Sequence, residues 1–404
     1  MGPLQISPTT PLASKVLSMK YIPRLLAKQL LKASKSFPAI LLTGPRQSGK
    51  TTLLKQAFPK ANYILLEDPD IIDRVKHDPR TFLDSLKLPV ILDEIQNAPE
   101  LLGYIRTRID ENAKRKGMWL LTGSQEAPLM HGVAESMAGR VAILQLLPFS
   151  IQESNKVTLL KGGYPDVIGK PSSADLWFRS YLQTYLERDV RAIAAVKDLT
   201  TFRRFIALLA SRHGSMLNKT DLAAPLGVSV PTITHWLNIL ELTGQLILVP
   251  PFYENFGKRL VKTPKVFFAD SGLACHLLGI ETLAELNKSP FIGALFEGFV
   301  AAEIVKHQLN QGKRKELYYF RDLQGLEVDF VVPKSANKLT LIEAKSTKTP
   351  KPSMAKSLQK LKKNIGSYQC QSLLVHNGTD NAVGQALLPG VSAVNLYKLV
   401  TELL

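Results

Sequence analysis

Cysteine is scarce in this sequence, and the marks of several protein classes are missing. The two cysteines among 404 residues, Cys275 and Cys370, lie far apart and form neither a disulfide framework nor a metal-binding pattern. No apolar run approaches the roughly 20 residues that a membrane-spanning helix needs. Residues 1–18 lack the apolar core of a signal peptide, and their Ser, Thr and Pro content predicts a disordered leader. We therefore expect a cytoplasmic protein with no membrane partner.

Acidic residues are few relative to basic ones. The 34 Asp and Glu residues face 51 Lys and Arg residues, which gives a formal net charge of +17 and a pI near 9.7. Such an excess favours a polyanionic partner, most often nucleic acid, although a generally basic surface would give the same total. The 45% hydrophobic and 21% charged content is typical of a globular protein, and the length predicts two or three domains.

A complete phosphate-binding motif, G-x-x-x-x-G-K-[ST], lies near the N-terminus. Residues 39–43 before it predict a buried strand and residues 52–57 after it predict a helix, which is the context that such a loop requires. Its glycines let backbone N–H groups turn toward phosphate oxygens, while Lys50 would stabilise the β- and γ-phosphates and Thr51 would bind Mg²⁺. The sequence therefore predicts a site for ATP and Mg²⁺. The residues expected to bind nucleotide are Gly44, Pro45, Arg46, Gln47, Ser48, Gly49, Lys50, Thr51 and Thr52.

Two acids end an apolar strand predicted over residues 88–94. Asp93 would hold Mg²⁺, directly or through water, and Glu94 would polarise the water that attacks the γ-phosphate. Acids at a strand end also begin ordinary loops, but the phosphate loop upstream favours the catalytic interpretation. A third strand over residues 118–124 would place Ser124 where it hydrogen-bonds the γ-phosphate or the attacking water, although the same residues are ordinary turn chemistry.

Two arginines are candidates for stabilising the transferred phosphate. Arg140 is the first, as an arginine finger or phosphate sensor, and a structural salt bridge would explain it equally well. If Arg140 acts across a subunit interface, the active form is a homo-oligomer. Arg188 is the second candidate, but neighbouring acids on its predicted helix offer an intrahelical ion pair instead.

These motifs together resemble a family of bacterial and archaeal AAA-type ATPases. In that family an ATPase domain precedes a winged helix and a C-terminal domain long described as of unknown function. The resemblance extends from Met19 over nearly the whole remaining chain, and it implies ATP hydrolysis without a settled cellular role. The segments that carry it are residues 22–24, 41–47, 92–96, 121–124, 138–141, 162–165 and 185–190. We expect an α/β protein with an AAA-type P-loop domain at 19–160, a helical linker and winged helix at 161–285, and a third domain at 290–404.

The middle of the chain contains a helix-turn-helix candidate. Residues 218–226 predict the first helix, residues 227–229 the turn, and Ser229 or its neighbour the cap of a second helix, with Pro231 near its first position. Ile233, Leu237 and Leu240 would form the apolar face of that helix, opposite Thr232, His235 and Asn238. Two strands, 245–249 and 265–268, would flank a basic wing at 257–259. The exposed face has little Arg or Lys, so a lid or protein contact is as well supported as DNA reading.

A second set of chemically active residues lies in the last part of the chain. Glu297 falls on a predicted helix, Asp329 on one strand, and Glu343 with Lys345 on the next, where alternate side chains share a face. This order resembles the restriction-endonuclease-like nuclease fold, with Val328 where the family motif has proline. The resemblance implies that Asp329 and Glu343 hold Mg²⁺ or Mn²⁺, while Lys345 stabilises developing charge. The fold can also persist as a binding module without catalysis.

Lysines crowd the segment after these acids. A helix so charged could follow a DNA backbone, or it could simply be a solvated face. These residues are Lys345, Lys348, Lys351, Lys356, Lys360, Lys362 and Lys363. The sequence therefore favours an ATP-hydrolysing DNA-binding protein that remodels or processes DNA, with metal-dependent cleavage as the finer expectation. Two alternatives stay open: an ATP-driven switch that recognises branched or ended DNA without cutting it, and a signalling or defence ATPase with protein partners.

Overall fold

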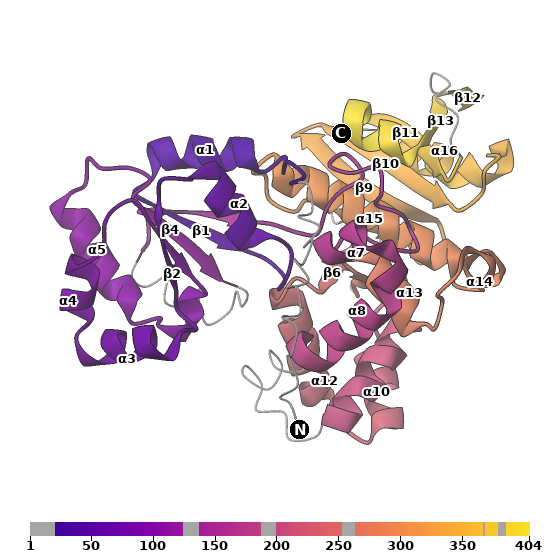
Figure 1. The fold of residues 1–404 in the computed structure, drawn as a ribbon. Coiled ribbons are helices and arrows are strands. Elements are labelled where there is room, and N and C mark those ends of the chain that lie inside the picture. Colours follow the sequence, from indigo (N-terminus) through magenta and orange to yellow (C-terminus); the bar gives the residue numbers. More distant parts are fainter. Residues whose placement is uncertain (1–20, 124–136, 187–198, 253–262, 367, 379–384) are drawn as a thin grey trace, which may run out of the picture.

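A computed structural model describes residues 21–123, 137–186, 199–252, 263–366, 368–378 and 385–404 (Figure 1). Ser124, Arg188 and the predicted wing at 257–259 lie outside these ranges. The strands of the described residues form a five-stranded sheet, a two-stranded sheet and a six-stranded sheet. No helix of these ranges combines the length and apolar character that a membrane crossing requires.

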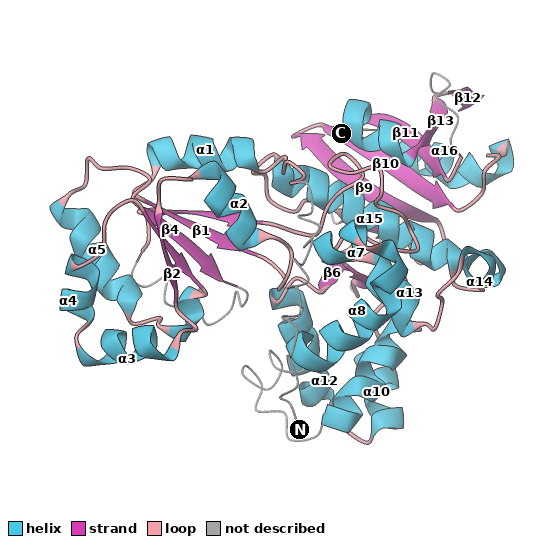
Figure 2. Ribbon diagram, viewed as in Figure 1, coloured by secondary structure: helices cyan, strands magenta, loops and turns pink. Residues whose placement is uncertain are grey.

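The N-terminal sheet is entirely parallel, with strand order β2-β3-β4-β1-β5. Its central strands are buried along their whole length because helices cover both faces (Figure 2). Ile40 and Leu42 pack with α1 and α2 on one face, while Leu41 packs with α3, α4 and α5 on the other. The strands are β1 (Ala39–Thr43), β2 (Asn62–Leu65), β3 (Val90–Asp93), β4 (Trp119–Gly123) and β5 (Val141–Gln145). The helices are α1 (Ala27–Ser36), α2 (Lys50–Ala57), α3 (Pro69–His77), α4 (Pro79–Asp84) and α5 (Leu101–Glu111).

The middle region is mainly helical and contains the predicted helix–turn–helix arrangement. The Ser229 side chain accepts a hydrogen bond from the Thr232 N–H and begins α12, so the predicted cap is confirmed. Ile233, Leu237 and Leu240 are buried as expected, and His235 and Asn238 are exposed. The elements are α7 (Pro165–Gly169), α8 (Ala174–Tyr181), α10 (Leu199–Ala210), α11 (Lys219–Ala223), α12 (Val230–Leu242), β6 (Leu246–Val249), β7 (Lys265–Phe268), α13 (Ser271–Leu277) and α14 (Leu283–Lys288).

The C-terminal sheet is mixed, with order β12-β13-β11-β10-β9-β8. Helix α15 packs on one face and α16 on the other (Figure 1). Strand β9 pairs antiparallel with both β8 and β10, whereas β11 pairs parallel with both β10 and β13. The elements are α15 (Ile292–Asn310), β8 (Tyr318–Arg321), β9 (Glu327–Ser335), β10 (Lys338–Lys345), α16 (Lys356–Asn364), β11 (Gln369–His376), β12 (Gln385–Leu388), β13 (Val391–Asn395) and α17 (Leu396–Lys398).

One apolar core runs through both the middle region and the C-terminal sheet. Phe267 of β7 belongs to the same buried cluster as Phe296 of α15 and Phe330 of β9, and the Phe267 and Phe330 ring centroids are 5.9 Å apart. Gly298 lets α15 pass close to His213, because a Cβ at that position would overlap the imidazole ring. The predicted boundary at 285–290 therefore does not separate two cores.

We expect the free energy of unfolding to decrease as the pH falls from about 6.5 toward about 3. Burial lowers the pKa of His213 to about 3, and its Nδ1 accepts the Phe268 N–H at 3.2 Å. The unfolded chain binds a proton at this histidine near pH 6.5, whereas the folded chain does not. The contribution of neutral His213 to the free energy of unfolding is therefore complete above pH 6.5 and decreases in acid by up to about 1.4 kcal/mol per pH unit. Urea unfolding of wild type and His213→Asn across this pH range measures the effect. The same pH dependence of the free energy of unfolding in both proteins would contradict the prediction.

Candidate nucleotide site and C-terminal acid cluster

The phosphate loop follows β1 and leads directly into α2. Gly44 and Gly49 have φ angles of 137° and 96°, a region that glycine enters without steric cost. A Cβ on Gly44 would overlap the Leu146 carbonyl oxygen, so the loop and the end of β5 approach this closely only with glycine. Gly49 precedes the first residue of α2, whose N-terminal N–H groups attract an anion.

Lys50 lies folded over the loop. Its Nζ donates to the carbonyl oxygens of Gly44 and Pro45, both at 2.9 Å, and its side chain is buried with 5% of its surface exposed. The two carbonyls hold the ammonium beside the loop. This is the position from which it can contact phosphate oxygens.

Asp93 lies next to Thr51 at the carboxyl end of the sheet. The Thr51 hydroxyl is 3.0 and 2.9 Å from the two Asp93 carboxylate oxygens, and the Tyr63 hydroxyl donates to Oδ2 at 2.8 Å. The Thr122 hydroxyl also donates to Asp93. Burial and the nearby Asp93 raise the pKa of Tyr63, so it stays a donor. A hydroxyl beside a buried carboxylate is a donor set that fits Mg²⁺.

Glu94 follows Asp93 in an unusual backbone conformation. Its φ of 61° is rare for a residue with a side chain, and its N–H donates to the Thr122 hydroxyl at 2.9 Å. The Gln96 amide donates to the Glu94 carboxylate. Residues in such backbone regions cluster at functional sites. This turn directs Glu94 into the cleft beside Lys50 and Thr51.

The cleft beside the loop has a volume of about 1150 Å³, which is enough for a nucleotide. Loop and α2 residues line one side, and residues of the middle region line the other. The turn after α12 also approaches the loop, because a Cβ on Gly244 would lie 3.0 Å from the Pro45 ring. The lining from outside the motif includes Ile22, Phe149, Asn155, Lys156, Pro165 and Asp166.

Arg24 joins the phosphate loop to the chain after β5. Its guanidinium donates to Ser48 O at 2.8 Å, to Leu147 O at 2.6 Å and to Glu153 at 3.0 Å. The side chain is buried, and it lies 4.4 Å from the centre of the Phe149 ring. The sequence motifs assign no role to this arginine, to Tyr63 or to Thr122. An arginine before the first helix, in the segment 22–24, was the available signal, but its partners are 24 to 129 residues away in sequence.

Arg140 lies far from the phosphate loop of its own chain. Its carbonyl accepts the Ala39 N–H at the start of β1, whereas the loop follows the opposite end, about 13 Å along the strand. Its guanidinium pairs with Asp110 at 2.6 and 3.1 Å. The structure thus supplies the salt bridge that the sequence offered as the alternative. A finger role across a subunit interface stays a prediction.

The C-terminal acids do come together. Beyond the Phe330–Ile342 pair β9 and β10 separate, and the Asp329 carboxylate accepts the Ala344 N–H at 2.9 Å. Lys345 Nζ lies 2.7 Å from Glu343 and 3.8 Å from Asp329. The Ser357 hydroxyl donates to the other Glu343 oxygen at 3.0 Å. Burial and Asp329 raise the pKa of Glu343, while Lys345 opposes that rise.

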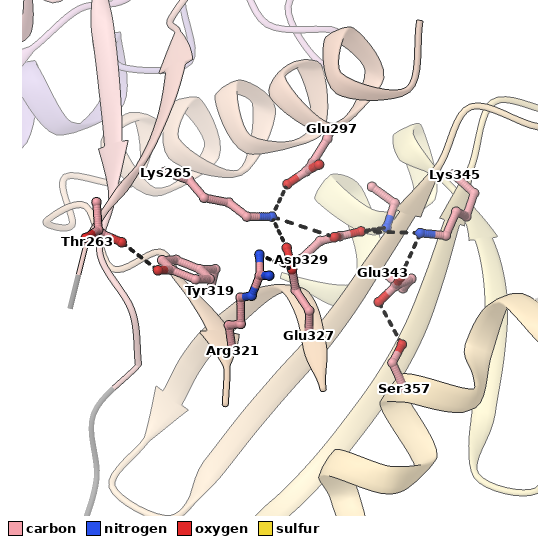
Figure 3. A network of polar contacts seen from close by, with 11 residues as sticks. Thr263, Lys265, Glu297, Tyr319, Arg321, Glu327, Asp329, Glu343, Lys345 and Ser357 are labelled. Carbon is pink, nitrogen blue, oxygen red and sulfur yellow. Dashed lines mark hydrogen bonds and ion pairs between the residues drawn. The ribbon is translucent and has the colours of Figure 1, made fainter. Parts of the chain in front are cut away.

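A lysine that the sequence analysis did not select enters the same cluster. Lys265 of β7 places its ammonium between Glu297 of α15, Glu327 and Asp329 (Figure 3). Burial and Asp329 raise the pKa of Glu297, and Lys265 opposes that rise. Lys265 begins the strand predicted after the wing, and nothing in its local sequence marks it. Its role follows from the packing of β7 on α15.

This arrangement does not fit the metal ion predicted between Asp329 and Glu343. Lys345 lies against both carboxylates, and Lys265 fills the space between Asp329, Glu297 and Glu327. In the described part of the chain, no group of three or more acid, histidine or cysteine side chains is placed to hold a metal ion. The expectation of Mg²⁺ or Mn²⁺ at these residues is therefore unsupported by the geometry.

We expect Arg24→Ala to lower the free energy of unfolding by about 3 kcal/mol, because it leaves Glu153 and two carbonyls without their buried partner. ATP affinity should fall about tenfold, since Ser48 loses the contact that positions the loop. Urea unfolding and calorimetric ATP titration measure the two effects. Arg115→Ala, an exposed arginine, is the control, and equal behaviour of both variants would refute the role of Arg24.

Three protein families each match one part of the chain, and together they cover most of it. The family described as an AAA domain matches residues 36–155, so this part is an AAA-type P-loop ATPase domain. Two families described as domains of unknown function, DUF8612 and DUF4143, match residues 152–284 and 292–399. Those descriptions name neither a winged helix nor an endonuclease, and both assignments stay predictions.

Two mycobacterial proteins are similar over most of their length. "Uncharacterized protein Mb2031c" of Mycobacterium bovis and "Uncharacterized protein Rv2008c" of Mycobacterium tuberculosis are each 32% identical over 333 residues, which is 80% of this chain and 74% of theirs. Among solved structures, the Walker-type ATPase paby2304 of Pyrococcus abyssi is 17% identical with a TM-score of 0.42, over 62% of this chain and 94% of that one. The chain belongs to the same family as Mb2031c and Rv2008c, and within it residues 36–155 form an AAA-type ATPase domain.

Proposed function

We propose that this protein binds and hydrolyses ATP in the cleft beside the phosphate loop. The observation that carries the proposal is the meeting of the loop, Thr51, Asp93 and Glu94 at one edge of the sheet. Loop N–H groups and Lys50 would hold the phosphates. Thr51 and Asp93 would hold Mg²⁺, which neutralises phosphate charge when it is bound.

Glu94 is the residue best placed to act on water. It lies in the cleft, and the Gln96 amide donates to its carboxylate and orients it. A carboxylate in this position can accept a hydrogen bond from water and direct the water oxygen toward the γ-phosphate. Sequence alone proposed this role, and the described contacts support it.

We further propose that DNA is a partner and that α16 contributes to its binding. Leu358 and Leu361 turn one face of α16 into the core, while Lys356, Lys360 and Lys363 are exposed. None of these lysines forms an ion pair with an acid among the residues that the structure describes. Unpaired lysines along one exposed helix suit a phosphate backbone. Metal-dependent cleavage is not part of this proposal, because Lys265 and Lys345 already pair with the acids that would hold the metal.

We expect Lys50→Ala to abolish ATP hydrolysis and to weaken ATP binding at least tenfold, because the loop loses its phosphate-facing charge. Glu94→Gln should retain ATP binding yet lower the hydrolysis rate by about 100-fold or more. Phosphate release and ATP titration distinguish the two effects. Lys60→Ala and Glu100→Gln are exposed controls that should match wild type. Hydrolysis at the wild-type rate by Glu94→Gln would remove Glu94 from the mechanism.

Replacing Lys356, Lys360 and Lys363 by Gln should flatten the salt dependence of duplex DNA binding. Three lost phosphate contacts change the slope of log K against log salt by roughly 2 to 3. The matched control replaces Lys28, Lys32 and Lys35, exposed lysines of α1, and should keep the wild-type slope. Single-stranded, duplex and four-way branched DNA are compared in binding and in ATPase assays. Binding to none of them, with unchanged ATPase rates, would favour protein partners instead.

A further inference from the structure

The ammonium of Lys265 occupies the centre of a cluster of acids. It lies 2.8 Å from Glu297 Oε1, 2.7 Å from Glu327 Oε1 and 3.9 Å from Asp329 Oδ1 (Figure 3). Only 4% of the side chain is exposed. These acids come from α15 and β9, whereas Lys265 comes from β7 of the middle region. A single buried cation thus contacts carboxylates from two elements of the C-terminal region.

The acids require positive charge in this position. Carboxylates withdrawn from water at this spacing repel one another, and a cation between them is needed if they are to stay ionised. A divalent metal or an ammonium group can meet that requirement. Here two lysines of the chain provide the positive charge, because Lys345 also contacts Asp329 and Glu343.

Lys265 is held firmly in this position by its neighbours in sequence. Val266, Phe267 and Phe268 are buried in the core that the middle region shares with α15 and the C-terminal sheet. The backbone of Val266 bonds to both Gly214 and Ser215. The strand that carries Lys265 is therefore anchored in a packed core.

We propose that Lys265 takes the place of a divalent cation, so that the cluster is a metal-free joint between the middle region and the C-terminal sheet. Lys265 pairs with Glu297 and Glu327 and lies 3.9 Å from Asp329, while Arg321 and Lys345 bring further positive charge to Glu327 and Asp329. These acids in turn fix β7 against α15. The cluster then resembles a metal-dependent nuclease in the arrangement of its residues but does not bind a metal ion. This inference concerns the C-terminal cluster and is independent of ATP hydrolysis.

Mn²⁺ binding to the full chain tests the proposal without altering Lys265. Electron paramagnetic resonance counts bound Mn²⁺ in an Asp93→Asn background, which removes the nucleotide-site ligand. We expect this chain and the same chain with Asp329→Asn to bind equal amounts of Mn²⁺. An additional Mn²⁺ ion that Asp329→Asn abolishes would overturn the proposal, because a metal would then bind with Lys265 in place.

A variant at Lys265 supplies the converse test. In the same background, Lys265→Met should lower Tm by about 10 °C, because Glu297 loses its buried cation partner while Glu327 and Asp329 keep only Arg321 and Lys345. Mn²⁺ should then bind and restore part of the loss, and Asp329→Asn should remove that gain. Lys306→Met is the matched control: Lys306 is equally buried on α15 but bonds Glu303 and a carbonyl, so Mn²⁺ should not rescue it.

Two results with these variants would refute the exchange of lysine for metal. A folded Lys265→Met chain that gains no Mn²⁺ affinity shows that the acids do not form a cation site. Rescue of Lys306→Met to the same degree shows that Mn²⁺ stabilises the chain elsewhere. If Lys265→Met does not fold, the comparison of Asp329 variants still decides. ATPase rates with Mg²⁺ in the chain that retains Asp93 report separately on the nucleotide site.

Discussion

The burial of three positive charges determines how the parts of this chain are joined, because a cation withdrawn from water must meet acids or carbonyl oxygens. Arg24 ties the phosphate loop to the chain after β5 through Ser48 O and Leu147 O. Lys306 of α15 donates to Phe149 O, so the same segment is tied to the C-terminal region. Lys265 attaches β7 to the C-terminal acids. Each joint uses one long side chain to satisfy several oxygens, which makes its geometry specific as well as stable.

The segment around Phe149 is a meeting point of these joints. Its ring lies under Arg24, its carbonyl accepts from Lys306, and its N–H donates to Gly163 O. Phe149 also lines the cleft proposed for ATP. The nucleotide cleft and α15 are therefore connected through a single short stretch of chain. This continuity describes contact in space, and coupling between the two regions is a separate property that only binding measurements establish.

Local patterns predicted much of this structure, and distant contacts account for the rest. The loop from Gly44 to Thr51 and the cap at Ser229 follow from neighbouring residues, so short motifs were sufficient. Asp329, Glu343 and Lys345 were brought together as expected, because strand alternation fixes which side chains share a face. Lys265 could not be found this way: its partners are 32 or more residues away, and only the packing of β7 on α15 selects it. The same holds for Arg140, whose pairing with Asp110 depends on its place just before β5.

The shared apolar core also limits how the chain can be divided into fragments. Family matches end at residue 284 and resume at 292, which suggests a cut between them. A fragment that begins there would contain α15 without β7, so Phe296 would face water and Glu297 would lose Lys265. The N-terminal sheet, by contrast, has its own apolar clusters on both faces. The smallest piece with an intact C-terminal sheet therefore starts at about Leu147, where the shared core begins, and it must include the whole middle region.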